Sequence, residues 1–317
     1  MKKTVPILML GGAKRVSMAE QLIRAGAELD TDVIIYSHEL SDKEPIASVG
    51  KIIKGGNYSE YKSLEEINGI IKQYDIKILL PFIDPSIEIA ARYKQLNPEV
   101  LVPVSDIDTA KAMFDKVKAA VWFEKAGIAI PETYSIQECK FPAIAKPRNG
   151  SASKGIIIIE NPQQLFDLAD PDNYLIQEYI SHRDEYTVDC YIGSDNEIKC
   201  IVPRIRMATA GGEATKTETR RIPGLIALSS GIIKNLTLKG AVTLQFIHDI
   251  NNSRFLLMEI NTRLGGGVIC SIMAGADIPK MIIQEAIGYK VEVCDNWKDR
   301  ALMTRYFKEV MFFNNAK

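Results

Sequence analysis

Histidine is scarce in this chain, with three residues (His38, His182 and His248) standing far apart in 317 positions. A histidine-rich metal site is therefore not expected. The five cysteines form no C-x-x-C pair and their number is odd, so we interpret them as buried thiols in a reducing cytoplasm. No Ser-His or Cys-His arrangement indicates a side-chain nucleophile.

An excess of charge of one sign is also missing, because the formal net charge is −1. The chain thus lacks the basic footprint of a nucleic-acid-binding protein. No apolar run approaches the ~18 residues that a membrane span needs. The run Val5–Leu10 is too short for the core of a signal peptide, so we expect a cytoplasmic protein with neither nucleic acid nor membrane as partner.

With 46% hydrophobic and 25% charged residues, the chain has room for two or three subdomains. Its first hundred residues alternate strand-like runs (5–10, 32–37, 76–81) with helix-like patterns such as 87–96, which indicates a small parallel α/β layer. The glycine turn at 11–12 does not match G-x-G-x-x-G, and no acidic residue ends the next strand. A dinucleotide-dependent oxidoreductase is therefore not favoured.

The stretch Gly240–Gly267 predicts two strands joined by a polar turn, followed by a glycine-rich corner. Gln245 lies in the first strand, and Glu259, Asn261 and Arg263 follow at a period of two, so they point to one side of the backbone. Such a face can hold a divalent cation bridged to phosphate oxygens, with a guanidinium fork for an anionic oxygen. An edge hairpin with a solvated polar face is the alternative.

A second signal lies in Phe141–Ile159, where Lys146 ends a short apolar strand and a run of small residues, Gly150–Gly155, follows. Backbone N–H groups of such a loop can form a nest of donors for phosphates, and lysine suits a phosphate as a point charge. A flexible hairpin turn explains the glycines and serines equally well. A β run follows instead of a helix, so the loop is not a Walker A motif.

Four further signals have ordinary structural explanations beside the functional ones. Residues 174–191 predict strand, loop and strand, and Glu185 there is either a ligand for hydroxyl donors or a solvated acid. Asp84 lies at the C-terminal end of a strand, where α/β sheets place ligands, but it could equally be a helix N-cap with Glu88 as its capping-box partner. Arg204 and Arg220 could meet a phosphate or carboxylate, or belong to a solvated hairpin.

The order and spacing of these signals resemble the ATP-grasp superfamily of carboxylate–amine ligases, and within it the ATP-binding half of carbamoyl-phosphate synthase large chains. The match covers residues 110–290 closely and 1–105 more loosely, and this chain resembles the stand-alone relatives. The implied fold is a small parallel α/β pre-ATP-grasp domain (1–108), a small lobe or lid (109–183) and a C-terminal lobe with antiparallel sheets and a metal site (184–317).

The resemblance also implies a role for each motif residue. Lys116, within a predicted helix Asp108–Lys125, and Lys146 hold the nucleotide phosphates, while Arg263 neutralises the transferred group and Asp84 faces the acceptor substrate. The residues that would contact the rest of the nucleotide or the metal are the lid residues Gly150, Ser151, Ala152, Ser153 and Gly155, the adenine-binding backbone of Glu178, Tyr179 and Ile180, the ribose ligand Glu185, and the metal ligands Gln245, Glu259 and Asn261.

The implied activity is ADP-forming activation of a carboxylate as an acyl phosphate, followed by attack of an amine or ammonia. ATP and one or two Mg²⁺ ions, with Mn²⁺ as an alternative, are the implied cofactors. The implied partners are small-molecule carboxylate and amine substrates and a second copy of the chain in a homodimer. A small-molecule kinase and a catalytically silent nucleotide-binding regulator are the alternatives, although a regulator is expected to have lost the acid or amide at 259 or 261.

Overall fold

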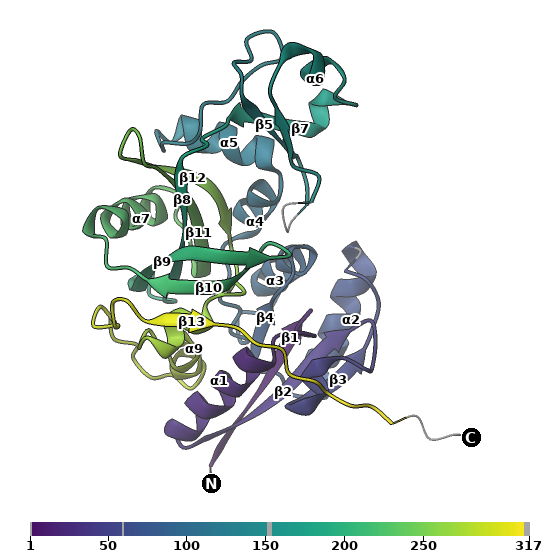
Figure 1. Cartoon of the computed structure of the whole chain (residues 1–317). Helices are drawn as coiled ribbons and strands as arrows, with labels where there is room; N and C mark the ends of the chain where they lie inside the picture. Colours follow the sequence, from purple (N-terminus) through teal and green to yellow (C-terminus); the bar gives the residue numbers. More distant parts are fainter. Residues whose placement is uncertain (1, 59, 151–153, 314–317) are drawn as a thin grey trace.

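The protein was analysed as a computed structural model, which describes residues 2–58, 60–150 and 154–313. Its N-terminal part is a four-stranded parallel sheet in the order β3-β2-β1-β4 (Figure 1). The elements of this part are β1 (Lys3–Leu10), α1 (Val16–Glu28), β2 (Thr31–Glu39), a 3-10 turn (Pro45–Ser48), β3 (Lys51–Lys54), α2 (Glu60–Gln73), β4 (Ile78–Pro81) and α3 (Asp84–Leu96).

The apolar run of β1 is continuous because both faces of this sheet are covered. Ile7 and Met9 pack in one core cluster with α1, whereas Leu8 and Leu10 pack in another with α2 and α3. The parallel α/β layer predicted from the sequence is therefore confirmed.

The middle of the molecule is a six-stranded sheet in the order β12-β11-β8-β9-β10-β13. Its pairs are antiparallel, as predicted. The elements are β8 (Arg183–Ile192), β9 (Ile198–Ala210), β10 (Glu213–Thr219), α7 (Pro223–Asn235), β11 (Gly240–Asp249), β12 (Arg254–Asn261), α8 (Ile269–Met273), α9 (Ile278–Ala286) and β13 (Leu302–Thr304). The polar turn predicted after Asp249 joins β11 to β12.

A small lobe at the top of Figure 1 is built on a three-stranded antiparallel sheet in the order β6-β5-β7. Its strands and helices are β5 (Ala143–Pro147), β6 (Ile157–Ile159), α6 (Pro162–Phe166), a 3-10 turn (Pro171–Asn173) and β7 (Tyr174–Glu178). The lobe has its own core, which includes Ala143, Ile159 and Leu165. A lobe with a separate core can tilt against the rest of the chain with little disturbance of packing.

The parallel sheet and the six-stranded sheet are joined by a shared core. One cluster unites Ile7 and Met9 of β1 with Tyr191 of β8, Val202 of β9 and Ile282 of α9. The sequence-based domain limits at 108 and 183 stay a prediction. Within the described residues no helix combines the length and apolarity of a membrane span.

Candidate active site

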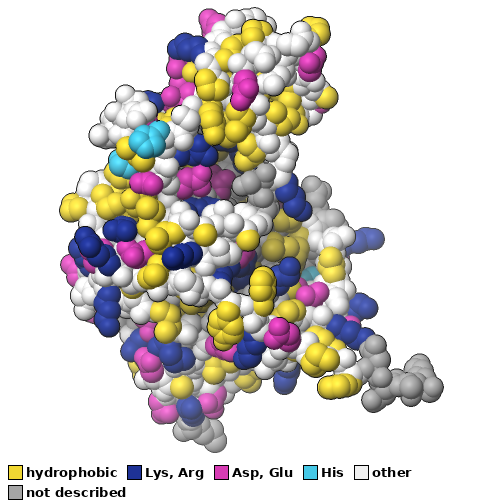
Figure 2. All heavy atoms as spheres, viewed as in Figure 1, with side chains coloured by type: hydrophobic (Ala, Val, Ile, Leu, Met, Phe, Trp, Pro, Cys, Tyr) yellow, Lys and Arg dark blue, Asp and Glu magenta, His cyan; other side chains and the backbone are white. Residues whose placement is uncertain are grey.

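A cleft of about 610 Å³ lies between the small lobe, the six-stranded sheet and the C-terminal ends of the parallel strands. Figure 2 shows a hollow beneath the small lobe in which lysine, arginine and acidic side chains gather. Its volume falls in the range of about 300–1,000 Å³ that is usual for small-molecule sites. The described lining residues include eight lysines or arginines and five carboxylates, so the cleft favours an anionic ligand.

Lys116 reaches the cleft from the first turn of α5 (Lys116–Lys125). The single helix predicted over 108–125 is wrong, because the helix breaks at Asp115 between α4 (Ile107–Phe114) and α5. The Asp115 carboxylate caps α5 by accepting from Val117 N and Lys118 N, and it pairs with Arg148 Nε at 2.8 Å. An aspartate that bonds nearby backbone N–H groups in this way competes with continuation of a helix. The break places Lys116 where its Nζ donates to Gly150 O at 2.7 Å.

Lys146 lies near the end of the predicted strand β5, and its side chain is almost fully buried. Its Nζ donates to Gln177 Oε1 at 2.9 Å on the neighbouring strand β7. Burial lowers the pKa of Lys146 to about 8, although the Glu259 carboxylate opposes this shift. An ammonium held in such a place gains most from a ligand that brings negative charge.

The small-residue loop after β5 is described only at its ends. Gly150 and Gly155 both have positive φ and Gly150 accepts from Lys116, while Ser151, Ala152 and Ser153 lie outside the described residues. A Cβ on Gly155 would stand 2.9 Å from Pro147. The role of this loop as a phosphate lid stays a prediction.

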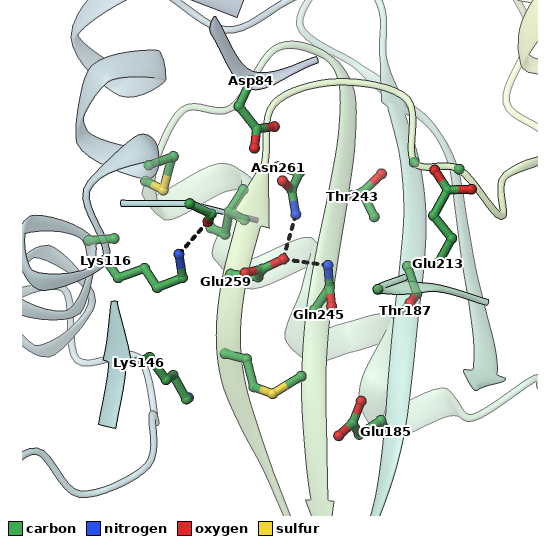
Figure 3. A pocket seen from close by; sticks show the side chains of 18 of the residues that line it. Asp84, Lys116, Lys146, Glu185, Thr187, Glu213, Thr243, Gln245, Glu259 and Asn261 are labelled. Atoms are coloured by element: carbon green, nitrogen blue, oxygen red, sulfur yellow. Dashed lines mark hydrogen bonds between the residues drawn. The ribbon is translucent and has the colours of Figure 1, made fainter. Parts of the chain in front are cut away.

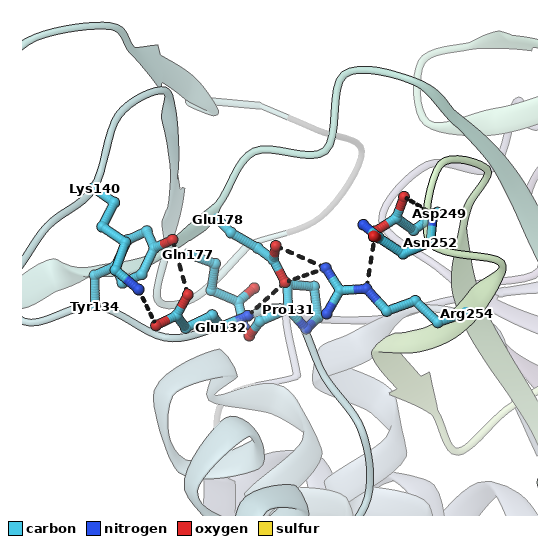
Figure 4. Close-up of polar contacts among 9 residues, drawn as sticks. All are labelled: Pro131, Glu132, Tyr134, Lys140, Gln177, Glu178, Asp249, Asn252 and Arg254. Carbon is cyan, nitrogen blue, oxygen red and sulfur yellow. Dashed lines mark hydrogen bonds and ion pairs between the residues drawn. The ribbon is translucent and has the colours of Figure 1, made fainter.

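Glu178, Tyr179 and Ile180 lie on the cleft wall where the chain leaves β7. The Glu178 carboxylate accepts from Glu132 N at 3.0 Å and from Arg254 at 2.9 Å (Figure 4). Tyr179 N donates to Pro142 O at 3.3 Å. The side chain of Glu178 thus ties the small lobe to the start of β12, and adenine binding by the backbone of this segment stays a prediction.

Glu185, the predicted ribose ligand, lies on the cleft face of β8. Its carboxylate stands between two guanidinium groups, 3.4 Å from Arg183 Nε and 3.8 Å from Arg206 Nε. Arg183 also donates to Ile180 O at 2.6 Å. Glu185 is therefore not the merely solvated acid that the sequence left as an alternative.

Glu259 on β12 is flanked by Gln245 on β11 and by Asn261, as Figure 3 shows. Gln245 pairs with Glu259 in register, and a bulge follows directly between Gln245 and Phe246. Both amides donate to the same carboxylate oxygen, Glu259 Oε1, and the bond from Asn261 Nδ2 is 2.9 Å long. The three predicted metal ligands are thus brought together on the cleft face.

The side-chain amides of Gln245 and Asn261 now present their nitrogens to Glu259. To bind a cation there, these amides would have to present their oxygens instead. Gln245 Oε1 is held by Arg206 Nη1 at 2.7 Å, whereas Asn261 uses its nitrogen on Glu259. Among the described residues, no group of three or more His, Cys, Asp or Glu forms another metal centre. One carboxylate with neighbouring amide oxygens suits Mg²⁺, because Mg²⁺ takes few protein ligands and completes its shell with phosphates and water.

Arg263 and Asp84 meet across the cleft, although 179 positions separate them in the chain. Arg263 Nε donates to Asp84 Oδ1 at 2.9 Å, and Nη2 lies 2.8 Å from the same oxygen. The capping-box alternative for Asp84 is wrong. Ile83 is the N-cap of α3 without a side-chain bond, and Glu88 pairs with Arg92 at 2.8 Å instead. Asp84 thus faces the site because Arg263 binds it.

The two predicted substrate arginines, Arg204 and Arg220, both pair with carboxylates of the chain. Arg204 touches the cleft wall, but it is buried and donates to Asp189 at 2.7 Å. Arg220 does not belong to the described cleft lining, and it pairs with Glu218 at 2.8 Å. Because each of these cations already has a carboxylate partner, their role toward a substrate stays a prediction.

Two features of the cleft were missed in the sequence. Arg206 lies two positions after Arg204 on the same strand and therefore on the same face. This spacing was the sequence signal that could have identified Arg206 as a cleft residue. Glu213, after the β9–β10 turn, binds Arg15 at 2.7 Å and Arg305 at 2.5 Å, and these cations hold its pKa at about 2 against the opposing effect of burial. These partners lie about 200 and 90 positions away, so no local pattern could predict them.

The acid at the end of β2 also differs from expectation. Glu39 does end this strand, but it is buried, and Ser37 Oγ donates to its carboxylate at 2.5 Å. Gly12 N and Ala13 N also bond it. The carboxylate therefore closes the glycine turn itself, which agrees with the rejection of a dinucleotide site there.

Comparison with known proteins agrees with this geometry. A family model described as "ATP-grasp in the biosynthetic pathway with Ter operon" matches residues 170–308. Biotin carboxylase 1 of Bacillus subtilis (strain 168) is 23% identical over 324 residues, covering 89% of this chain and 70% of the relative.

Two solved structures share the fold over most of the chain. The biotin carboxylase domain of Hydrogenobacter thermophilus 2-oxoglutarate carboxylase, a dimer solved with MgADP, ADP and bicarbonate, has a TM-score of 0.74 at 17% identity. It covers 94% of this chain and 73% of the other. N5-carboxyaminoimidazole synthetase from Staphylococcus aureus with ADP has a TM-score of 0.72 at 18% identity, covering 92% and 79%.

The fold and the cleft are those of an ATP-grasp protein, and an ATP-grasp family model matches residues 170–308 of the chain. It is similar over most of its length to a biotin carboxylase and to an N5-carboxyaminoimidazole synthetase.

Proposed function

We propose that this protein is an ADP-forming ligase that activates a substrate carboxylate as an acyl phosphate and joins it to an amine or ammonia. The observation that carries the proposal is the meeting, in one cleft, of two lysines suited to phosphates, Lys116 and Lys146, with the carboxylate–amide set around Glu259. The names of the matched relatives agree with this chemistry. ATP and Mg²⁺ are the cofactors that follow from it.

Different residues of the cleft bind successive parts of the nucleotide. The backbone at Glu178–Ile180 takes the adenine edge, and Glu185 accepts the ribose hydroxyls. Lys116 and Lys146 hold the phosphates, with Glu259 and Asn261 at their terminal end. Glu259, Gln245 and Asn261 would hold Mg²⁺, which would supply positive charge to the phosphates.

The reaction needs no side-chain nucleophile. A carboxylate oxygen of the substrate attacks the γ-phosphorus in line, the bond from that phosphorus to the β–γ bridging oxygen breaks, and ADP leaves. Arg263, held by Asp84, faces the charge that spreads over the transferred group. The amine then attacks the acyl carbon through a tetrahedral intermediate, losing a proton as inorganic phosphate departs. Closure of the small lobe would exclude water that otherwise hydrolyses the acyl phosphate.

Assembly and location are further parts of the proposal. A homodimer is supported by the dimeric state of one similar structure. A cytoplasmic location is supported by five free cysteines, among them the buried Cys190 and Cys200. The kinase and regulator alternatives have no specific observation in their favour.

The test is ADP release by wild-type protein, by Glu259→Gln and by Glu292→Gln, which serves as a control because Glu292 is an exposed acid paired with Lys290. We expect Glu259→Gln to lose turnover by a factor of about 10² or more, with a melting temperature near that of the wild type. The Glu292→Gln variant should keep the wild-type rate. An unchanged rate in Glu259→Gln would remove the site assignment.

A further inference from the structure

Arg206 is one of the residues that line the cleft. It lies on β9, and β8 separates this strand from β11 in the sheet. Its guanidinium nevertheless reaches across β8, since Nη1 donates to Gln245 Oε1 on β11 at 2.7 Å. Nη2 donates in the other direction, to Gly212 O in the β9–β10 turn, at 3.0 Å. Two of its three nitrogens are thus fixed by the protein.

The third nitrogen, Nε, is buried and has no hydrogen-bond partner. The side chain is only 10% exposed, and the nearest carboxylate oxygen, Glu185 Oε2, lies 3.8 Å away, beyond hydrogen-bond distance. A buried N–H without an acceptor is rare in native proteins and destabilises the state that contains it. Because Arg206 lines the cleft, a ligand oxygen can supply the missing acceptor.

We propose that Arg206 is a nucleotide-binding residue that donates from Nε to the phosphate nearest the ribose. The inference rests on the proposed function, which puts the ribose at Glu185 and the terminal phosphates at Glu259. Arg206 stands between these two points. It is 3.8 Å from Glu185 and bonded to Gln245, the neighbour of Glu259.

The chemistry of a guanidinium fits a phosphate at this place. Its planar, always charged fork binds phosphate oxygens in fixed directions. Binding of a phosphate oxygen to Nε would break no existing hydrogen bond, because Nη1 stays bonded to Gln245 and Nη2 to Gly212. Arg204, two positions earlier on the same face, cannot act in this way, because Asp189 accepts from its Nε at 2.7 Å and lies 3.3 Å from Nη2.

The test compares Arg206→Gln with wild type in titrations of ATP, ADP, AMP and adenosine by calorimetry, with weak ligands measured by displacement of ADP. Arg220→Gln is the matched control, because Arg220 also has a buried Nε without partner but lies outside the described cleft lining. We expect Arg206→Gln to weaken ATP, ADP and AMP by about tenfold or more, as loss of a charge-assisted contact does. Adenosine should bind within twofold of wild type, and Arg220→Gln should bind all four as wild type does.

Each other outcome separates this inference from the proposed function. If wild-type protein binds no ATP, the proposed function fails and the inference fails with it. If wild type binds ATP and Arg206→Gln binds the three phosphates equally well, only the inference is refuted. An equal loss for adenosine would also refute it, because Arg206 would then act on the ribose or on the shape of the cleft.

A repeat without Mg²⁺, in EDTA, distinguishes direct from indirect action. A direct phosphate contact predicts the same fold-loss of ADP affinity in EDTA. A loss confined to Mg²⁺ buffer would mean that Arg206 acts through Gln245 and Glu259, which contradicts the proposal. Should Arg206→Gln fail to fold, Arg206→Lys keeps the charge without the fork, and it should lose part of the phosphate affinity and none of the adenosine affinity.

Discussion

Lys146 should take up a proton when ATP binds in mildly alkaline buffer. Burial lowers its pKa to about 8 in the ligand-free cleft, whereas a bound polyphosphate favours the charged ammonium and raises that pKa. At pH 8.5 roughly three quarters of a group with a pKa of about 8 is neutral, so binding should absorb roughly 0.75 proton per site. If only the charged form binds phosphates, the affinity contributed by this group falls about tenfold per pH unit above pH 8.

The same shift fixes the pH dependence of stability. Between pH 8 and 10.5 the folded chain has lost this proton while the unfolded chain keeps it, so the free energy of unfolding rises with pH across that window. The full effect of lowering the Lys146 pKa from 10.5 to about 8 is about 3 kcal/mol. Below pH 8 Lys146 is charged in both states and its burial opposes folding, which an anionic ligand would offset.

Proton uptake is measured by calorimetric titration of ATP at pH 8.5 in buffers that differ in ionisation enthalpy. Lys146→Arg is the control, because arginine stays charged at this pH and cannot take up a proton. Subtraction of the two data sets removes protons that come from the nucleotide itself. Equal uptake by wild type and Lys146→Arg would refute the reasoning about Lys146.

Two further predictions concern the support of the cleft floor. Asp189→Asn leaves the Arg204 charge buried without its carboxylate, so urea unfolding should show that the free energy of unfolding falls by about 3–5 kcal/mol. The control Ser271→Ala removes one hydroxyl donor to Asp189 (2.6 Å) and should lower the same free energy by about 1 kcal/mol. Similar losses in the two variants would contradict the importance of the ion pair. Gly267→Ala would put a Cβ 2.5 Å from Arg204 Nη1, and because Asp189 fixes that guanidinium we expect a loss of about 1–3 kcal/mol. The control Gly231→Ala lies in α7, where nothing stands within 4 Å of the added Cβ, so it should instead raise the free energy of unfolding by about 0.5–1 kcal/mol. An equal change in stability for both glycine variants would contradict the close approach of Gly267 to Arg204.

The parts of the fold predicted from the sequence are those set by local alternation. The two strands around Asp249, the strand that carries Lys146 and the α/β layer follow from the spacing of apolar residues, and the structure confirms them. The period of two in Glu259 and Asn261 likewise placed both side chains on the cleft face. Such patterns need only the geometry of one or two neighbouring strands.

What the sequence could not predict depends on partners distant in the chain. Alternation treats Arg204 and Arg206 alike, yet Asp189 neutralises the first and leaves the second facing the cleft. The Arg263–Asp84 pair joins residues that are 179 positions apart in the chain and has no local signature. The helix break at Asp115 was missed for a different reason, because a single side-chain cap interrupted an otherwise continuous helical pattern.

The most direct test of the central claim is trapping of the acyl phosphate. Purified protein is incubated with MgATP, hydroxylamine and pools of carboxylic and amino acids, and ADP and hydroxamate are measured together, with Glu259→Gln as the blank. The account predicts that one pool yields ADP and a hydroxamate in equal amounts with wild type and neither product with Glu259→Gln. ADP formed with a stable phosphorylated product and no hydroxamate would indicate a kinase, and absence of ATP binding would contradict the account altogether.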